Sequence, residues 1–435
     1  MKKTTVNATL NTESTIKHSF TGKKLTAYSG LSPINQFLQK LDLRAELNRL
    51  FRTQEYNSLK FLNVHILLAV IFGSLCGINR LSRITNMTAD PLVMQLLGIK
   101  KMFNKDLIST RLKSFGEAGA RKLHDFFQLI AHEELRKSGL TSITLDVDST
   151  VSGVCGNQEG TAKGYNPPKK GAKSYHPLIG FISELKLVVN TWFRTGSAYT
   201  SNGVVEFIRE IYARLPLTIT SVFFRADSGF FNGDLFTQCE NYGWRFLVKA
   251  KFKGLDELLK RQSWVANSDG NEYCIFEYRC GSWNCKRTFY GVRKITGTTT
   301  AQMLGEEVQV PVYMYAAFCS NLGCSAQEIY QNYRERSTSE TWIEEVKSQS
   351  LAGQTHTDSF HANEMLWLLN AMAYNIGVLA RRATASAKTF EHKSFRDLFM
   401  NVPGKLAVVK GELTVQLYKL YYFARQWKEI EVAII

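Results

Sequence analysis

Two aspartates in one short strand-like run are the first residues of this sequence whose side chains could take part in a reaction. Asp146 and Asp148 lie two residues apart in ITLDVD, residues 143–148, where apolar and polar residues alternate. Residues two apart in a strand share a face, so both carboxylates are expected to point the same way. Aspartate is unfavourable in strands, and a pair of them therefore indicates a function such as metal binding.

A third aspartate, Asp227, ends the apolar run ITSVFFRAD (219–227) and is followed by Ser-Gly, which turns the chain. A carboxylate at the carboxyl end of a core strand lies where open α/β sheets bind their ligands. An aspartate at a strand end can also cap the next turn. Taken alone, this residue leaves both interpretations open.

Further charges lie in YRERSTSETWIEEVK, residues 333–347, within a helix expected over about 326–350. Four side chains of this helix fall within an arc of about 60° at about 100° per residue: Tyr333, Arg336, Glu340 and Lys347. Glu344 lies close to this stripe and is the rival carboxylate. The alternative interpretation is an ordinary charged helix face held by i,i+4 pairs.

The elements expected to position these groups follow the order β-β-β-α-β-α-β from residue 141 onward. The strand-like runs are 143–148, 178–183, 185–193, 219–227 and 244–251, with helices near 202–215 and 233–241. In a ribonuclease-H-like fold the first and fourth strands of this order lie side by side, so an aspartate of the first strand and Asp227 would converge. A glutamate from a later helix would complete a carboxylate cluster, which suits Mg²⁺ or Mn²⁺ and the in-line displacement of a phosphoryl group.

The composition favours a polyanionic partner. The chain has 435 residues and a formal charge of +16, which points to nucleic acid first and to an anionic membrane second. Its N-terminus never becomes apolar, and its most apolar stretch, residues 65–76, is too short to span a bilayer. We therefore expect a cytoplasmic protein that does not associate with a membrane.

The regions outside the expected core differ in pattern. Residues 31–140 show helical periodicity with recurring basic residues, which favours a DNA-binding domain, although a solvated basic face is the alternative. Residues 264–320 are rich in aromatic and β-branched residues and predict a β-rich insert. Two cysteine pairs have a spacing that permits a zinc site, with small apolar packing as the default: Cys280 with Cys285, and Cys319 with Cys324.

Four motifs, taken together, resemble the DDE transposases of bacterial insertion sequences. The branch with a Tyr-x2-Arg-x3-Glu-x6-Lys signature is matched in full by residues 333–347. LDVDST resembles the family's first-aspartate motif and selects Asp148 over Asp146, and FRADSGFF resembles the second and selects Asp227. The loop NQEGTAKGYNPPKKGAKSYHPLIGF is similar to a stretch that follows the first aspartate in one subgroup.

This resemblance implies a set of residue roles. The catalytic and metal-binding residues would be Asp148, Asp227 and Glu340, which would hold two Mg²⁺ ions, with Mn²⁺ as a substitute. Arg336 and Lys347 would hold DNA phosphates, and Tyr333 would stack or hydrogen-bond near the cut end. Further DNA contacts are expected in the loop after the first aspartate: Lys169, Lys170 and Lys173. Trp264 and Trp283, in the β-rich insert, are candidates for stacking a displaced base.

The resemblance also implies a reaction and a domain plan. The protein would bind the terminal inverted repeats of its element as a homodimer, free a 3′-OH, pass through a hairpin and join target DNA, in the bacterial nucleoid. The expected parts are a loose N-terminus (1–30), the DNA-end-binding helices (31–140), the ribonuclease-H-like domain (141–385, insertion about 252–322) and a C-terminal segment that is a candidate for dimerisation (386–435). Two alternatives are a ribonuclease-H-like nuclease that does not join strands and a transposase descendant that only binds DNA.

Overall fold

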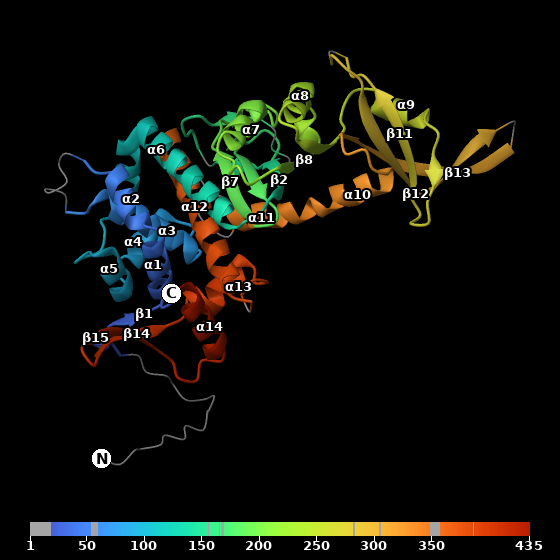
Figure 1. Cartoon of the computed structure of the whole chain (residues 1–435). Coiled ribbons are helices and arrows are strands. Elements are labelled where there is room, and N and C mark those ends of the chain that lie inside the picture. Colours follow the sequence, from blue (N-terminus) through green and yellow to red (C-terminus); the bar gives the residue numbers. More distant parts are fainter. Residues whose placement is uncertain are drawn as a thin grey trace.

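The structure is a computed structural model that describes residues 19–53, 60–154, 156–164, 166, 169–281, 283–303, 306–348, 357–385 and 387–435. It is a mixed α/β fold, with a helical region at one end, a central sheet and a long β-hairpin at the other end (Figure 1). No helix within the described residues is long and apolar enough to cross a membrane.

A nine-stranded sheet joins the core and the β-rich insert in the order β10-β11-β12-β13-β9-β8-β2-β6-β7. Its strands are β2 (Ser142–Ser149), β6 (Leu178–Ile182), β7 (Leu187–Trp192), β8 (Ser221–Ala226), β9 (Arg245–Lys249), β10 (Val265–Ala266), β11 (Glu272–Tyr278), β12 (Arg287–Met303) and β13 (Glu306–Ser320). The strand β8 runs parallel to both β2 and β9, whereas β6 and β7 are antiparallel to their neighbours. The expected adjacency of the first and fourth core strands is therefore confirmed.

Helices cover both faces of the core part of this sheet, which explains why β6 is buried along its whole length. On one face, α7 (Val204–Tyr212) and α8 (Gly233–Asn241) lie together, and the rings of Tyr212 and Tyr242 stack at 3.8 Å. On the other face, α11 (Ser337–Ser348) and α12 (Phe360–Arg382) pack on Phe181 of β6 through Trp342 and Tyr374.

The expected single helix over 326–350 is two helices, α10 (Ala326–Glu335) and α11, which meet at Arg336. Arg336 keeps right-handed helical angles (φ −59°, ψ −26°), so the axis is barely interrupted. The Ser-Thr-Ser run at 337–339 accounts for the break, because such side chains compete for backbone groups. The Thr338 hydroxyl indeed donates to the carbonyl oxygen of Glu335 at 2.8 Å.

The N-terminal helical region is packed on α12 and is closed by the C-terminal segment. Its helices are α1 (Leu31–Lys40), α2 (Leu43–Leu50), α3 (Asn63–Leu75), α4 (Leu81–Met87), α5 (Pro91–Leu97) and α6 (Leu107–Lys137). The C-terminal elements are α13 (His392–Phe395), η4 (Arg396–Met400), β14 (Gly404–Val409), β15 (Glu412–Leu417) and α14 (Ala424–Ile434). The short strand β1 (Leu25–Thr26) pairs with β14, and a Cβ at Gly30 would lie only 2.2 Å from the carbonyl oxygen of Phe399.

Smaller elements complete the chain. The strands β3 (Ser152–Gly153), β4 (Ala162–Lys163) and β5 (Lys173–Tyr175) form a separate sheet directly after β2. A short turn, η2 (Ser228–Phe230), follows β8, and α9 (Leu255–Lys260) opens the β-rich insert.

Candidate active site

Asp148 and Asp227 emerge side by side where β2 and β8 end. Val147 is the parallel partner of Ala226, so the next residue of each strand is one of the two aspartates. Asp227 accepts a hydrogen bond from the backbone N–H of Gly229 at 2.9 Å. It therefore caps the turn, and it also lies close enough to Asp148 for its charge to raise the pKa of that residue. The turn-capping interpretation of Asp227 is therefore confirmed, and its role as a ligand stays a prediction.

The ionised form of Asp148 is disfavoured in this setting. Burial raises the pKa of Asp148 to about 7, and repulsion from Asp227 and Glu340 acts in the same direction. The Arg336 guanidinium and the N–H of Ser149 oppose the shift. A cation placed between these carboxylates would therefore stabilise the ionised form.

In this structure the Arg336 side chain supplies that cation. Its Nη2 donates to Oδ2 of Asp148 at 2.7 Å, and its Nη1 lies 3.7 Å from Oε1 of Glu340. The Arg336 side chain is only 5% exposed, whereas Glu340 is 70% exposed. Within the described residues, no three His, Cys, Asp or Glu side chains are placed to hold one metal ion. The structure thus brings the predicted residues together around an arginine, without closing the three carboxylates into one ligand set.

Asp146, the aspartate set aside above, belongs to a buried ion pair. Both its carboxylate oxygens accept from Arg225 on β8, at 2.8 Å from Nε and 2.9 Å from Nη2, and Ser183 donates a third bond. The two residues are register partners on neighbouring strands, and their side chains are 1% and 5% exposed. This pairing gives Asp146 a structural partner and leaves Asp148 at the site.

Arg225 is a residue of this site that the sequence analysis missed. Its Nη1 donates to the carbonyl oxygen of Asn332 on α10 at 2.9 Å and lies 3.6 Å from Oε2 of Glu335. The buried Arg225 side chain therefore joins β2, β8 and α10. Asp148 lies in β2, Asp227 follows β8, and α10 leads into the helix that carries Glu340. The sequence FRAD, residues 224–227, contains a signal for this role of Arg225, because a cationic side chain inside an apolar strand needs a buried partner.

Tyr333 and Lys347, the other members of the helix stripe, differ in their surroundings. Tyr333 packs on Phe318 with ring centroids 4.6 Å apart, and burial raises its pKa to about 12. Lys347 is half-buried near the end of α11, and the rival carboxylate Glu344 is exposed. Of the four stripe residues, Arg336 is therefore buried, Tyr333 and Lys347 are half-buried, and Glu340 is exposed.

Glu345, on the same helix, faces the core. It is buried, accepts from the N–H of His392 at 3.0 Å and lies 3.3 Å from Arg381. This glutamate anchors α11 to α12 and α13 and is not part of the carboxylate site.

The lysine-rich loop after the first aspartate lies at the surface. Lys169 and Lys170 are exposed, and Lys173 donates to the side-chain oxygen of Asn157 at 2.7 Å. Tyr165, in the same loop, lies outside the described residues. His176, which follows the loop, forms a hydrogen bond between its Nδ1 and the carbonyl oxygen of Ala198 at 2.6 Å.

The β-rich insert packs its cysteines and tryptophans. Burial raises the pKa of Cys280 to about 11 and raises that of Cys319 further. In the part of the chain that the structure describes, these cysteines do not form a group of three ligands placed to hold a metal ion. Trp283 lies 5.1 Å from the Arg287 guanidinium and lines a polar cavity of about 290 Å³ beside α8. Trp264 lies under Arg293, at 4.9 Å.

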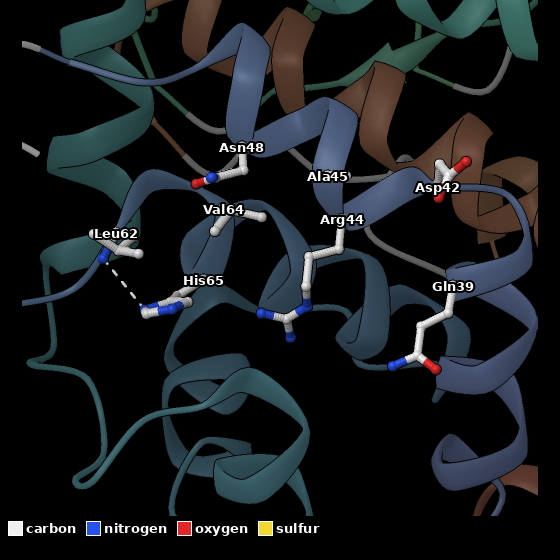
Figure 2. Close-up of a pocket in the computed structure, with 8 residues that line it drawn as sticks. All are labelled: Gln39, Asp42, Arg44, Ala45, Asn48, Leu62, Val64 and His65. Atoms are coloured by element: carbon white, nitrogen blue, oxygen red, sulfur yellow. Dashed lines mark hydrogen bonds between the residues drawn. The ribbon is translucent and has the colours of Figure 1, made fainter.

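A separate hollow of about 420 Å³ lies in the helical region, between α2 and the start of α3 (Figure 2). Arg44 lines it and donates to the last carbonyls of α5, including that of Leu97 at 3.5 Å. Burial lowers the pKa of His65 to about 4, so its neutral ring can accept the N–H of Leu62 at 3.2 Å. The polar groups of this hollow thus hold helix ends together.

The chain is similar to known transposases in sequence and in fold. The sequence model of one family, described as Transposase DDE domain group 1, matches residues 8–430. A cryo-EM structure of a piggyBac transposase synaptic complex with hairpin DNA is 14% identical, with 87% of this chain and 81% of that chain covered and a TM-score of 0.50. A Mos1 transposase paired-end complex with the left transposon end is 13% identical, covering 36% of this chain and 52% of that chain, with a TM-score of 0.18. A search of curated proteins finds no match.

Proposed function

This chain belongs to the family of transposase DDE domains of group 1, and we propose from this premise that it moves an insertion sequence by cutting and joining DNA. The substrates would be the terminal inverted repeats of the element and a target duplex. The observation that carries the proposal is the meeting of Asp148 and Asp227 at two adjacent strand ends, with Glu340 linked to them through Arg336.

The strand order supports a ribonuclease-H-like catalytic core. Strands β7, β6, β2, β8 and β9 form a continuous block in which the first three are antiparallel neighbours and the last three are parallel. This arrangement is the one expected from the β-β-β-α-β-α-β order. The strands β10–β13 then form the insertion between Asp227 and Glu340, and the helices over 31–140 are the proposed DNA-end-binding domain.

The donor set fits divalent cations that prefer oxygen. Asp148, Asp227 and Glu340 would hold two Mg²⁺ ions, or Mn²⁺ in their place, once Arg336 leaves Asp148. Such ions, when bound, stabilise the attacking and leaving oxygens of an in-line phosphoryl displacement. The exposed position of Glu340 lets it turn toward the two aspartates without crossing the core.

The remaining stripe residues would act on the DNA backbone. Arg336 neutralises the carboxylates before the ions bind, and its planar fork is suited to gripping a phosphate after release from Asp148. Lys347 would add a point charge along the same helix axis, and Tyr333 would line the path of the cut end. The lysines of the surface loop, Lys169 and Lys170, would contact the backbone beyond the cut.

The experiment is an incubation of the full chain with labelled duplexes from the two sequences that flank its gene and with a plasmid target. With Mg²⁺ we expect nicking at the duplex ends, a hairpin product and joined plasmid. Asp148→Asn should keep DNA binding and lose all three products. Asp256→Asn, the same change on an exposed aspartate of α9, is the matched control and should behave as the wild type.

Other outcomes separate the competing functions. Cleavage without joined plasmid would assign the chain as a nuclease. Full activity of Asp148→Asn would remove that residue from the catalytic set. DNA binding without cleavage by the wild type would leave a binding protein only.

A further inference from the structure

The loop that follows β7 lies at the same edge of the sheet as the two candidate aspartates. Strand β6 is antiparallel to both β2 and β7, so β7 runs in the same direction as β2 and β8 and ends at the edge where they end. Asp148 and Asp227 lie at this edge. We call residues 195–202 the edge loop, which leads from the end of β7 to Gly203, the residue before α7.

The edge loop contacts the chain next to both aspartates. The Thr200 hydroxyl lies 3.3 Å from the hydroxyl of Ser149, the residue that follows the first aspartate. A Cβ at Gly229 would lie only 2.8 Å from Cγ2 of Thr200, and the N–H of Gly229 donates to Asp227. Thr200 therefore lies between the two strand ends, and Tyr199 is its neighbour in the chain.

A buried arginine holds the edge loop in this position. Arg194, which precedes the loop, is 9% exposed. Its Nη1 donates to the carbonyl oxygens of Tyr199 and Thr200, at 3.3 Å each, and of Asn202, at 2.7 Å. Its Nε donates to the carbonyl oxygen of His176 at 2.9 Å. The carbonyl oxygen of Tyr199 also accepts from the N–H of Asn202 at 3.1 Å, so the backbone at Tyr199 is fixed from two sides.

Holding the loop in this way has a cost, because these partners of Arg194 are carbonyl oxygens and not carboxylates. Burial lowers the pKa of Arg194 to about 10. Taking a cation out of water costs free energy that a counter-ion would offset. The loop also fits closely on the small sheet, since a Cβ at Gly196 would clash with the carbonyl oxygen of Ser174 in β5. These features indicate that the conformation of the edge loop matters for function.

The fixed loop exposes one aromatic side chain. Tyr199 is 74% exposed, and the rest of the edge loop is small and uncharged. Positive charge is close in the chain, because the exposed Lys169 and Lys170 lead into β5, on which the edge loop packs. Lysines contact phosphates, whereas an aromatic ring packs on the uncharged face of a nucleotide. A tyrosine on a fixed backbone makes such a contact at a low cost in entropy.

We propose that Tyr199 packs against the uncharged face of a nucleotide, a base or a deoxyribose, in the DNA held at Asp148 and Asp227, and that Arg194 is the positioning residue of this contact. The inference rests on the proposed function, because it takes DNA as the substrate at this edge of the sheet. The contact belongs to the loop after β7 and involves neither the helix of Glu340 nor the β-rich insert. It carries no charge, and this property separates it from the contacts of the lysines.

The test measures the affinity of the full chain for a labelled duplex from the flanking DNA at several salt concentrations. Tyr199→Ala should bind about 5- to 150-fold more weakly, which is the usual contribution of one stacking contact. The slope of log affinity against log salt should stay at the wild-type value, because no phosphate contact is lost. Lys169→Ala should instead reduce this slope by about 1. Tyr199→Phe keeps the ring and should bind as the wild type.

Tyr212→Ala is the matched control. Tyr212 is 46% exposed and ends α7, the helix that begins after the edge loop, so it lies toward the opposite edge of the sheet. This variant should bind DNA with wild-type affinity. Circular dichroism and the urea midpoint check that each variant is folded.

A double-mutant cycle tests the positioning role of Arg194. Arg194→Lys keeps the charge but cannot reach all the carbonyl oxygens, and Arg194→Gln, without the charge, serves if the first variant does not fold. Either variant should weaken DNA binding with the salt slope unchanged. If Arg194 acts through Tyr199, adding Tyr199→Ala should weaken binding by less than about twofold more. Effects that multiply would remove Arg194 from the contact.

Duplexes with one abasic site, moved along the strand, distinguish the two kinds of partner. If Tyr199 packs on a base, the abasic site at one position should weaken wild-type binding by the same factor as Tyr199→Ala. At that position it should have no further effect in Tyr199→Ala. If every abasic site weakens both proteins equally, the partner is a deoxyribose.

Three results would overturn the inference: wild-type affinity of Tyr199→Ala, a reduced salt slope in that variant, or a loss of binding in Tyr199→Phe as large as in Tyr199→Ala. A wild type that binds the duplex but does not cut it would refute the proposed function, and the affinities would still report on Tyr199. A wild type that does not bind DNA would overturn both.

Discussion

Replacing Arg225 by methionine should destabilise the protein far more than removing any surface ion pair. The Arg225 and Asp146 side chains are 5% and 1% exposed, so the change leaves a buried carboxylate with the Ser183 hydroxyl as its remaining side-chain donor. Removing one partner of a buried pair costs about 3–5 kcal/mol. Since folded proteins are stable by about 5–15 kcal/mol, this loss is a large fraction of the total.

Urea unfolding followed by circular dichroism measures the effect. R425A is the matched control, because Arg425 pairs with Glu429 at 3.0 Å but is 90% exposed. That variant should lose no more than about 1 kcal/mol. The double variant D146L/R225M removes both charges and should recover to within about 1 kcal/mol of the wild type, or exceed it.

The double variant also separates stability from positioning. It still lacks the bond from Arg225 to Asn332 and the contact with Glu335, which hold α10 against the sheet. A misplacement of about 1 Å at a reacting centre can cost about 100-fold in rate. We therefore expect a folded protein with wild-type DNA affinity and cleavage about 100-fold slower. A loss below about 1 kcal/mol in R225M, or wild-type cleavage by D146L/R225M, would refute the reasoning.

Four further predictions follow from the site and the fold. Mn²⁺ affinity, measured by electron paramagnetic resonance, should be about tenfold lower at pH 6 than at pH 8, because burial raises the pKa of Asp148 to about 7 and coordination needs the carboxylate. Without metal, the contribution of Asp148 to the free energy of unfolding should fall as the pH rises from 3.8, the ordinary pKa of an aspartate, to about 7, the pKa of Asp148 in the folded protein. Over this range the folded state keeps a proton that the unfolded state has lost. Urea midpoints of the wild type and of Asp148→Asn, measured across this pH range, check the prediction. EDTA should abolish cleavage without changing the circular dichroism spectrum, because Arg336 already bridges Asp148 and Glu340, and a cooperative loss of helix signal would contradict this. Asp90→Ala should cost about 1–2 kcal/mol in urea unfolding, because Asp90 caps α5 through the N–H groups of Leu92 and Val93, and a loss of a few tenths would show that the cap is dispensable.

Much of the core could be predicted from local pattern. The strand around Asp148 has a periodicity that admits one assignment, and it lies where it was expected. The two aspartates could be placed together because the order of elements fixes which strands are neighbours. The order of the elements can be read from hydrophobic periodicity, because periodicity depends on which side of each element is buried.

Long-range pairing could not be predicted in the same way. Asp146 and Arg225 are 79 residues apart, and only the register of β2 against β8 makes them partners. The angle of Arg336 on its helix was correct, but an angle does not say that an aspartate lies opposite. The expected phosphate-binding arginine is for that reason found buried against Asp148.

The pairing of β1 with β14 has a consequence for how the protein matures. Helices α1 to α5 are translated before the central sheet, whereas β14 and α14, which close their core, are translated after it. Contacts between segments so distant in sequence form slowly, because a long loop must close first. The helical region is therefore completed only after the central sheet has been translated, so the strands that carry the two aspartates are already present when that region finishes folding.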